Sequence, residues 1–183
     1  MRTDISYSEN AKLKDVIQWQ FFPKNTQAPE LLQEVVTCFK AVEVDIDSDH
    51  QTHKSDVVLN LVSPNLQSLG FQVEVGKRRA DKIRVPVLFG FNGKPKVSFD
   101  ADAYHIEKKT VIEVEAGRAL MNYQFLKDLF EACMMFDVDY LVLAVRKKYL
   151  KINDFDQIVD FFDTLYSSDR LSLPLKCVMI IGY

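Results

Sequence analysis

The chain has 183 residues, a formal net charge of −3 at pH 7, 48% apolar residues and 11% aromatic residues. This composition predicts one folded domain over residues 1–183 and excludes an intrinsically disordered chain. Three separated cysteines, Cys38, Cys133 and Cys177, indicate neither a disulfide framework nor a zinc site. No signal-like segment and no run of about 18 apolar residues occurs, so we expect a soluble protein in the cytoplasm.

The N-terminal part of the chain predicts an arm followed by a helix. Residues 1–27 show no clear period, and we expect an arm that packs through its aromatic side chains. Pro29 and the apolar residues that follow it at helical spacing predict a helix over residues 29–42.

A polar loop and a second helix follow. The aspartates within residues 45–53 match only the start of a calcium loop, because His50 stands where such a loop needs glycine. We therefore expect a solvated acidic loop there. Ser55 is the expected N-cap of the next helix, which Pro64 should kink or interrupt and Gly70 should end.

Two extended segments and a basic stretch lead to the middle of the chain. Residues 71–75 alternate like a strand, residues 85–91 are apolar enough for another, and Asn92-Gly93 predicts a turn. Only one acid, Asp81, interrupts the basic stretch, which contains Lys77, Arg78, Arg79, Lys82, Arg84, Lys94 and Lys96. Such a stretch can contact phosphates, although basic loops also serve simply to solubilise a surface.

The C-terminal third predicts two helices and two buried strands. Asn122 should cap a helix that ends near residue 136, and residues 139–145 predict a buried strand. A last helix should start at Asn153, and residues 176–181 predict the final strand. The expected buried stripe of the first of these helices is Phe125, Leu126, Leu129, Phe130 and Cys133.

The segment over residues 98–117 contains four acids that could share one face. It predicts two short strands joined by a charged turn, in which Asp100 and Asp102 point one way, as do Glu113 and Glu115. Four carboxylates on one small surface repel one another, so such a cluster either binds a cation or takes up protons. Carboxylates without His or Cys suit Mg²⁺ or Mn²⁺.

The element order and this acidic hairpin resemble the PD-(D/E)XK nuclease superfamily, the fold of many type II restriction endonucleases. In that family an Asp opens the hairpin and a (D/E)-x-K motif follows in the next strand. Asp102 matches the first acid, Glu113 matches the second acid eleven positions later, and Glu115 occupies the usual Lys position. Asp100 competes for the place of the first acid. The resemblance covers about residues 55–147.

The resemblance implies an α/β fold with a restriction endonuclease-like core, in which a central mixed β-sheet is flanked by α-helices. The core would span about residues 55–147, with an N-terminal helical extension and a C-terminal helix and strand.

The resemblance also implies a Mg²⁺-dependent endodeoxyribonuclease of restriction or defence type, with Mn²⁺ as a substitute ion. Asp102 and Glu113 would hold the metal, and Glu115 would either bind a second metal or accept a proton from the attacking water. The expected supporting residues are Asp100, Glu74, Arg118, Gln124 and Lys127, and the expected contacts to the nucleic-acid backbone are Lys77, Arg78, Arg79 and Lys82.

DNA is the expected partner, and a homodimer would suit the reaction because two symmetric sites can cut both strands. Two other functions stay open at this point. Glu115 in place of Lys also fits a noncatalytic nuclease-fold protein that binds nucleic acid or a protein partner. An ordinary α/β interaction domain with a solvent-facing acidic hairpin is the third alternative.

Overall fold

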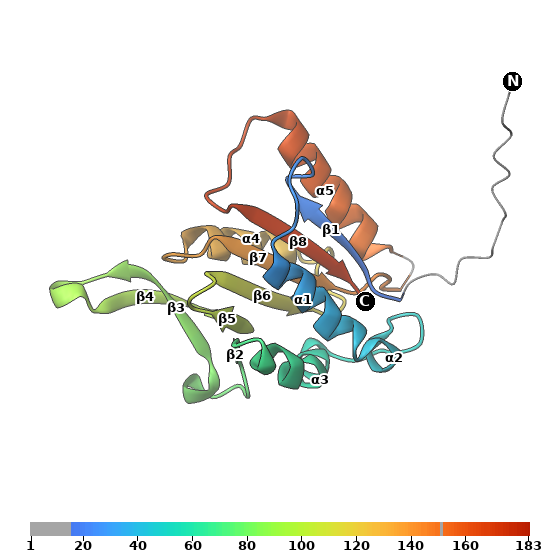
Figure 1. The fold of residues 1–183 in the computed structure, drawn as a ribbon, viewed down its shortest axis with the longest axis horizontal. Helices are drawn as coiled ribbons and strands as arrows, with labels where there is room; N and C mark the ends of the chain where they lie inside the picture. The colour runs from blue at the N-terminus through green and yellow to red at the C-terminus, as the bar shows by residue number, and fades with distance from the viewer. Residues whose placement is uncertain (1–15, 151) are drawn as a thin grey trace, which may run out of the picture.

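A six-stranded mixed sheet lies at the centre of the molecule in a computed structural model that describes residues 16–150 and 152–183 (Figure 1). Its strands lie in the order β1-β8-β7-β6-β5-β2. β6, β7 and β8 run parallel, whereas β1, β5 and β2 join antiparallel to their neighbours. The bounds are β1 Gln18–Phe22, β2 Gln72–Val73, β5 Ala103–His105, β6 Thr110–Glu115, β7 Tyr140–Val145 and β8 Cys177–Gly182.

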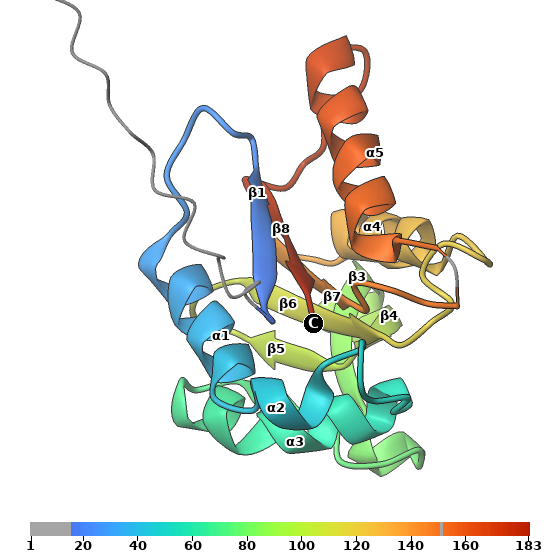
Figure 2. The same cartoon turned by 90° about the vertical axis from the view of Figure 1, so that its right-hand side faces the viewer.

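Helices cover both faces of this sheet, as Figure 2 shows. α1 (Glu30–Lys40), α2 (Glu43–Ile46) and α3 (Ser55–Ser68) pack on one face, and α4 (Gln124–Met134) and α5 (Asp154–Ser168) pack on the other. Covering both faces explains why the central strands are continuously apolar, since side chains on either side are buried. All residues of β8 and five of the six in β7 are buried.

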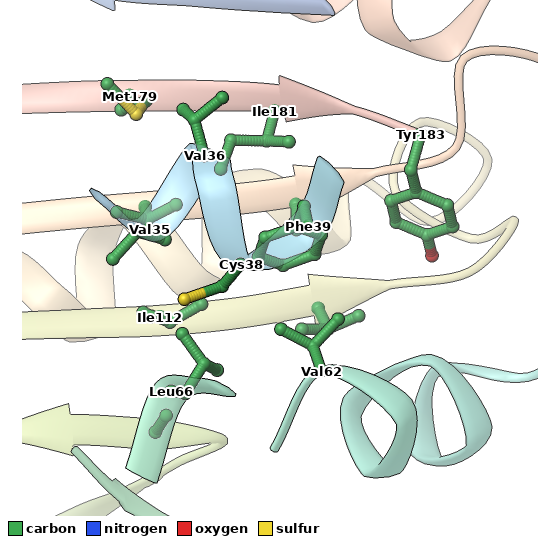
Figure 3. Close-up of a cluster of buried hydrophobic side chains, with 14 of the residues drawn as sticks. Val35, Val36, Cys38, Phe39, Val62, Leu66, Ile112, Met179, Ile181 and Tyr183 are labelled. Carbon is green, nitrogen blue, oxygen red and sulfur yellow. The ribbon is translucent and has the colours of Figure 1, made fainter. Parts of the chain in front are cut away.

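The larger core cluster lies under α1 and α3 (Figure 3). Val35 and Phe39 of α1 and Leu66 of α3 are fully buried there against Ile112 of β6. Val114 of β6 belongs to the same cluster. Because strand side chains alternate, the residues between and beyond Ile112 and Val114 point to the opposite face, toward α4 and α5.

A separate two-stranded arm projects from the body of the molecule (Figure 1). Its strands are β3 (Ile83–Phe89) and β4 (Pro95–Ala101), which pair antiparallel around a short 3₁₀ turn, η2 (Phe91–Gly93). Another short 3₁₀ turn, η1 (Arg79–Asp81), precedes the arm. The Asn92-Gly93 turn predicted from the sequence lies at the tip of this arm, where both residues have positive φ.

Most of the predicted elements are present, with α1, α5, β7 and β8 close to their expected bounds. The segment before α1 is not simply an arm, because β1 forms an edge strand of the main sheet; the part before residue 16 lies outside the described residues. α3 continues through Pro64 as one helix. The expected N-caps at Ser55 and Asn122 were wrong, since Lys54 and Tyr123 hold those positions.

Two expectations about packing were also wrong. Phe130 is half-exposed rather than part of the buried stripe of α4. The loop over residues 45–53 is not fully solvated, because Asp47 is buried and its carboxylate contacts the His50 ring nitrogen at 2.7 Å.

Candidate active site

Asp102 lies at the bend between β4 and β5, and the pairing of β5 with β6 places it beside the acids of β6. Ala103 pairs with Ile112, so the next position along the same register sets Asp102 opposite Glu113. The Val114 N–H donates to Asp102 Oδ2 at 2.8 Å, which leaves the other carboxylate oxygen for a different partner. The Glu74 N–H donates to the Asp102 carbonyl at 2.8 Å and holds the bend in place.

Glu113 and Glu115 lie on the face of β6 that is opposite to Ile112 and Val114. Both are partly buried within an otherwise buried strand, on the side that α4 covers. The Tyr183 hydroxyl donates to the Glu115 carbonyl at 2.9 Å and so fixes the end of β6. The chain then turns away at Gly117, whose φ of +96° and whose close approach to the Tyr149 ring leave no room for a side chain.

A further acid, Asp128 of α4, joins this group and was not predicted from the sequence. Its side chain is only 3% exposed. Gln124 Nε2 donates to Asp128 Oδ1 at 3.1 Å. The residue lies in the buried stripe of α4 with Phe125, Leu129 and Ala132, at positions i, i+3, i+4 and i+7. An acid within an apolar stripe marks an unusual position in the sequence, but the pattern alone does not show which acids it faces.

Burial raises the pKa values of all four acids, and the charges of neighbouring acids add to the effect in each of them. Burial and the charges of Asp102 and Asp128 raise the pKa of Glu113 well above its ordinary value. Burial and the same two neighbours raise the pKa of Glu115 to about 8. The pKa of Asp128 rises to about 7 and that of Asp102 to about 6, again mainly through burial. Clustering of such perturbed groups is typical of functional sites.

The donor chemistry of this cluster fits a hard divalent cation, because only carboxylate oxygens converge there. Within residues 16–150 and 152–183, no group of three or more His, Cys, Asp or Glu side chains is arranged to hold one metal ion. Mg²⁺ commonly uses only one or two carboxylates and completes its shell with water and substrate phosphate oxygens. These residues can therefore form a metal position that has two carboxylate ligands.

Several of the predicted supporting residues lie beside the cluster. Lys127 Nζ lies 3.4 Å from Glu131 Oε2 and 3.9 Å from Asp128 Oδ1. Its charge lowers the pKa of Glu115, as does that of Arg118. Gln124 contacts the cluster through its hydrogen bond to Asp128.

Other predicted residues lie elsewhere or are paired. Asp100 is in β4, opposite Arg84 of the arm, with its carboxylate 3.8 Å from the Arg84 side chain; it is not on the β5–β6 hairpin. The cause is the bend at residue 102, which transfers the chain from the arm to the main sheet. Glu74 binds Lys82 at 2.6 Å beside Asp102. The Lys82 charge lowers the pKa of Asp102, whereas the Glu74 charge raises it.

Two basic clefts flank the carboxylates. We call the first the arm cleft; its volume is about 550 Å³, and its charged lining residues are Lys77, Arg79, Lys82, Arg84, Lys127, Asp100 and Glu131. We call the second the loop cleft; its volume is about 920 Å³, and its lining includes the cations Lys54, Lys77, Arg118, Arg146 and Lys148 and the acids Asp49, Asp56 and Glu115. Lys77 lines both clefts and also binds Asp56 at 3.0 Å. Cations therefore predominate around the acids although the chain is acidic overall.

Of the four basic residues predicted to contact a backbone, three line these clefts: Lys77, Arg79 and Lys82. Arg78 is exposed next to them. No helix among the described residues has the length and apolar content needed to cross a membrane.

Comparison with protein-family models found no match to this sequence, and comparison with curated proteins found none either. Among solved structures, the chain is similar to the restriction endonuclease BglII in a complex with a DNA 16-mer. The TM-score is 0.50, the sequence identity is 12%, and the match covers 91% of this chain and 75% of the other. At this identity the likeness concerns the fold alone. The mixed sheet with helices on both faces thus has a restriction endonuclease-like fold.

Proposed function

We propose that this protein is a Mg²⁺-dependent endodeoxyribonuclease that hydrolyses DNA phosphodiester bonds, of restriction or defence type. The observation that carries the proposal is the placement of Asp102 opposite Glu113 across the β5–β6 register, with the Val114 N–H holding one oxygen of Asp102. Fold likeness to an endonuclease in a DNA complex supports the same substrate class. Fold alone does not specify chemistry, so the reaction is inferred from the residues of the site.

Each residue of the site has its own role in the proposed hydrolysis of the phosphodiester bond. Asp102 and Glu113 would hold Mg²⁺ or Mn²⁺, which when bound lowers the pKa of a coordinated water and polarises the scissile phosphate. Glu115 serves this reaction either as the acceptor of the water's proton or as a ligand of a second cation. Lys127 and Arg118 are the nearby cations that can stabilise the negative charge that develops on the phosphate.

The basic clefts give the DNA backbone a place to lie. Lys77 lines both clefts, Glu115 lines the loop cleft, and Lys82 and Lys127, whose charges act on the clustered acids, line the arm cleft. A duplex backbone is held mainly by such contacts to phosphate, which position the strand without reading its sequence. The chemistry of the clefts therefore favours a nucleic acid as the substrate.

A homodimer would complete the cleavage of a duplex, and an exposed apolar surface marks where two copies can meet. We call it the arm patch. It consists of Leu88, Phe89 and Phe91 of the arm, Phe130 and Met134 of α4, and Phe136, which lies just after α4. Phe89 and Phe136 pack edge to face at 5.0 Å, which joins the two parts. Phe91 is 96% exposed. We propose a second copy of this chain as the occupant, because the chain has one carboxylate cluster and a duplex has two strands.

The test is cleavage of plasmid and single-stranded DNA with Mg²⁺ or Mn²⁺. Glu113→Gln should abolish cleavage, whereas Asp100→Asn, which removes an exposed acid outside the β5–β6 hairpin, should retain it. If the wild type leaves both substrates intact and no divalent ion raises its Tm, the nuclease proposal is wrong. If the ions raise Tm and Glu113→Gln removes that effect without any cleavage, the protein is a noncatalytic member of this fold.

A further inference from the structure

Arg146 is a buried cation that has no acidic partner among the described residues. It is only 7% exposed, yet within residues 16–150 and 152–183 no carboxylate lies at ion-pair distance from its guanidinium. Burial raises the pKa of Asp154 to about 6, and the charge of Arg146 opposes this rise without an ion pair between the two side chains. A buried charge without a counter-charge is costly, so an anion that reaches Arg146 gains a strong partner.

The contacts of Arg146 orient its guanidinium without neutralising it. Its Nη2 atom donates to the His53 carbonyl, and its Cζ atom lies over the Tyr149 ring, 5.7 Å from the centroid. The Tyr149 ring is itself packed against Gly117, where no side chain fits. A guanidinium carries five N–H donors, so most of them can still donate to another acceptor. Arg146 is therefore held in a fixed direction in which it can bind an anion.

Arg146 lies at the edge of the sheet where the parallel strands β6, β7 and β8 end. Glu115 at the end of β6 pairs with Val145, the residue before Arg146. The Tyr183 hydroxyl, which lies at this end of the sheet in Figure 3, donates to the Glu115 carbonyl at 2.9 Å. Ligands of open α/β sheets commonly bind outside the carboxyl ends of the parallel strands. The location of Arg146 therefore suits a residue that binds a ligand.

The loop cleft gives an anion access to Arg146. This residue is the buried cation of the lining, and the exposed cations are Lys54, Lys77, Arg118 and Lys148. Of the three acids that line the cleft, Asp56 is paired with Lys77 at 3.0 Å. Cations thus outnumber acids in the cleft, and an anion that enters it meets exposed cations before it meets the buried guanidinium.

The burial of Arg146 favours a terminal phosphate over a phosphate within a strand. A guanidinium binds two phosphate oxygens at once through parallel N–H groups. A phosphomonoester carries a charge of about −1.5 to −2 near pH 7 and offers three oxygens, whereas a backbone phosphate carries a single charge. A backbone phosphate also has a sugar on each side, which keeps it at the exposed cations. A terminal group can reach the buried one.

We propose that the loop cleft binds a phosphomonoester, with Arg146 as the ligand of its oxygens and with Arg118 and Lys148 as supporting cations. This group occurs at a phosphorylated end of a nucleic-acid strand and on a free nucleotide. Hydrolysis of a phosphodiester also leaves it on one of the two new ends. The oxygen of water joins the phosphorus, the bond to one sugar oxygen breaks, and that oxygen takes up a proton. The inference goes beyond the proposed function, because the binding needs Arg146 and not the carboxylates.

The experiment compares single-stranded oligonucleotides of one sequence that carry a phosphate at the 5′ end, at the 3′ end or at neither end. Binding is measured in EDTA by the fluorescence anisotropy of a label on an internal base. EDTA prevents cleavage, and without a cation the carboxylates repel a phosphate, so a preference for a phosphorylated end reports on the basic residues. The wild type should bind one of the phosphorylated strands about tenfold more tightly or better, the effect of one hydrogen bond between charged groups.

Arg146→Gln should remove this preference, because glutamine offers no charge and no paired N–H groups. Arg170→Gln is the matched control, since Arg170 is exposed between α5 and β8 and lines neither the arm cleft nor the loop cleft; it should keep the preference. Arg146 also holds the His53 carbonyl, so thermal unfolding first establishes that Arg146→Gln is folded. The double variant Arg118→Gln/Lys148→Gln changes only exposed side chains and should weaken the preference.

The inference is overturned if the wild type binds phosphorylated and hydroxyl-ended strands equally, or if a folded Arg146→Gln keeps the preference. If Arg146→Gln does not fold, an undiminished preference in Arg118→Gln/Lys148→Gln overturns the inference instead. Competition separates the two sources of the group. Displacement of the phosphorylated strand by a nucleoside monophosphate at equal concentration identifies a nucleotide site, and displacement by phosphorylated strands alone identifies a site for strand ends. A preference for phosphorylated ends in a protein that cleaves no DNA would keep this inference and refute the nuclease proposal. Cleavage without that preference would do the reverse.

Discussion

The Val114 N–H donates to Asp102 Oδ2 at 2.8 Å, so the carboxylate at the start of β5 is tied to the strand that bears Glu113 and Glu115. This bond orients Asp102 without a charged partner. It therefore fixes the geometry of the acids while leaving their mutual repulsion in place. A bound cation or bound protons can relieve that repulsion in the folded protein.

The identity of residue 115 provides a first test of how that repulsion is relieved. Glu115→Lys places an ammonium group beside Asp128, and in EDTA it should raise Tm by several degrees. The reason is that the substitution removes one acid from the cluster and gives a cationic neighbour to Asp128, whose Oδ2 atom has no hydrogen-bond partner among the described residues. The measurement is thermal unfolding followed by circular dichroism.

The cleavage rate gives a second test at residue 115. Glu115→Gln should lower the cleavage rate by about 10–100-fold or more, as removal of metal-binding interactions commonly does. Glu115→Lys should retain more activity than Glu115→Gln, because its charge replaces part of the missing cation. Equal activity of Glu115→Gln and the wild type would contradict any role of Glu115 in the reaction.

The metal-free protein should lose stability as pH rises from about 4 to about 8. The pKa values of Asp102 (about 6), Asp128 (about 7) and Glu115 (about 8) are raised in the folded chain, and that of Glu113 is raised too. In the unfolded chain such groups titrate near roughly 3.9 for Asp and 4.3 for Glu. In this window the folded state holds protons that the unfolded state has released, so the free energy of unfolding falls with increasing pH.

Urea unfolding in EDTA at several pH values measures this slope. Asp128→Asn should flatten it, because one of the contributing groups is removed. The lowered pKa values of Asp47 and Asp56 act in the opposite direction, but only below about pH 4, where those groups titrate. Saturating Mn²⁺ should reverse the trend, since ionised carboxylates bind the ion more tightly. A free energy of unfolding that rises steadily between about pH 5 and 8 in EDTA would contradict the prediction.

How much of this arrangement the sequence could predict depends on whether local pattern or long-range pairing decides it. Helix α1 follows from Pro29 and its apolar spacing, and the run of apolar residues in β7 predicts a buried strand whatever its neighbours are. The juxtaposition of Asp102 with Glu113 also follows from a tight turn, because strand alternation and an even loop fix the register.

Three features depend on tertiary contacts and could not be found in this way. Asp100 and Asp102 alternate as if on one strand, but the bend at residue 102 divides them between two sheets. The strand β1 shows little alternation, since it is defined by pairing with β8 at the far end of the chain. Asp128 occupies a position in α4 that the apolar pattern assigns to the core, and only the facing acids of β6 explain a carboxylate there.

Salt dependence tests whether the arm cleft holds a nucleic-acid backbone. Removing one phosphate-binding cation should reduce the slope of log K against log salt by about 0.9 for duplex DNA. Arg79→Gln should therefore lower the slope by roughly that amount and weaken binding equally across DNA sequences, because cations that bind phosphate carry no sequence information. The measurement is fluorescence anisotropy with labelled duplexes. Ca²⁺ replaces Mg²⁺ so that cleavage of the duplex does not interfere with the binding measurement.

Lys176→Gln is the matched control for charge. Lys176 lies just before β8 and binds Asp139 at 2.9 Å, and it lines neither the arm cleft nor the loop cleft. Its removal changes the net charge by the same amount and should leave the slope unchanged. Equal slopes for Arg79→Gln and Lys176→Gln would show that the arm cleft does not hold the backbone.

The arm patch predicts the oligomeric state. Phe91 and Phe136 are the proposed anchors, since buried aromatic residues at the centre of an interface each contribute about 2 kcal/mol or more. The double variant Phe91→Ser/Phe136→Ser should weaken dimerisation by at least about 100-fold, and sedimentation velocity should change from a dimer to a monomer. Val44→Ser, which removes a 79% exposed valine of α2 outside the patch, should leave the dimer intact.

Plasmid cleavage gives a second readout of the same interface. A dimer with two carboxylate clusters should convert supercoiled plasmid to linear DNA within one binding event, because each cluster can cut one strand. The monomeric double variant should instead accumulate nicked circles at the same enzyme concentration, since its single cluster must release and rebind to cut the second strand. A wild type that sediments as a monomer at all concentrations and still linearises plasmid without a nicked intermediate would rule out the proposed dimer.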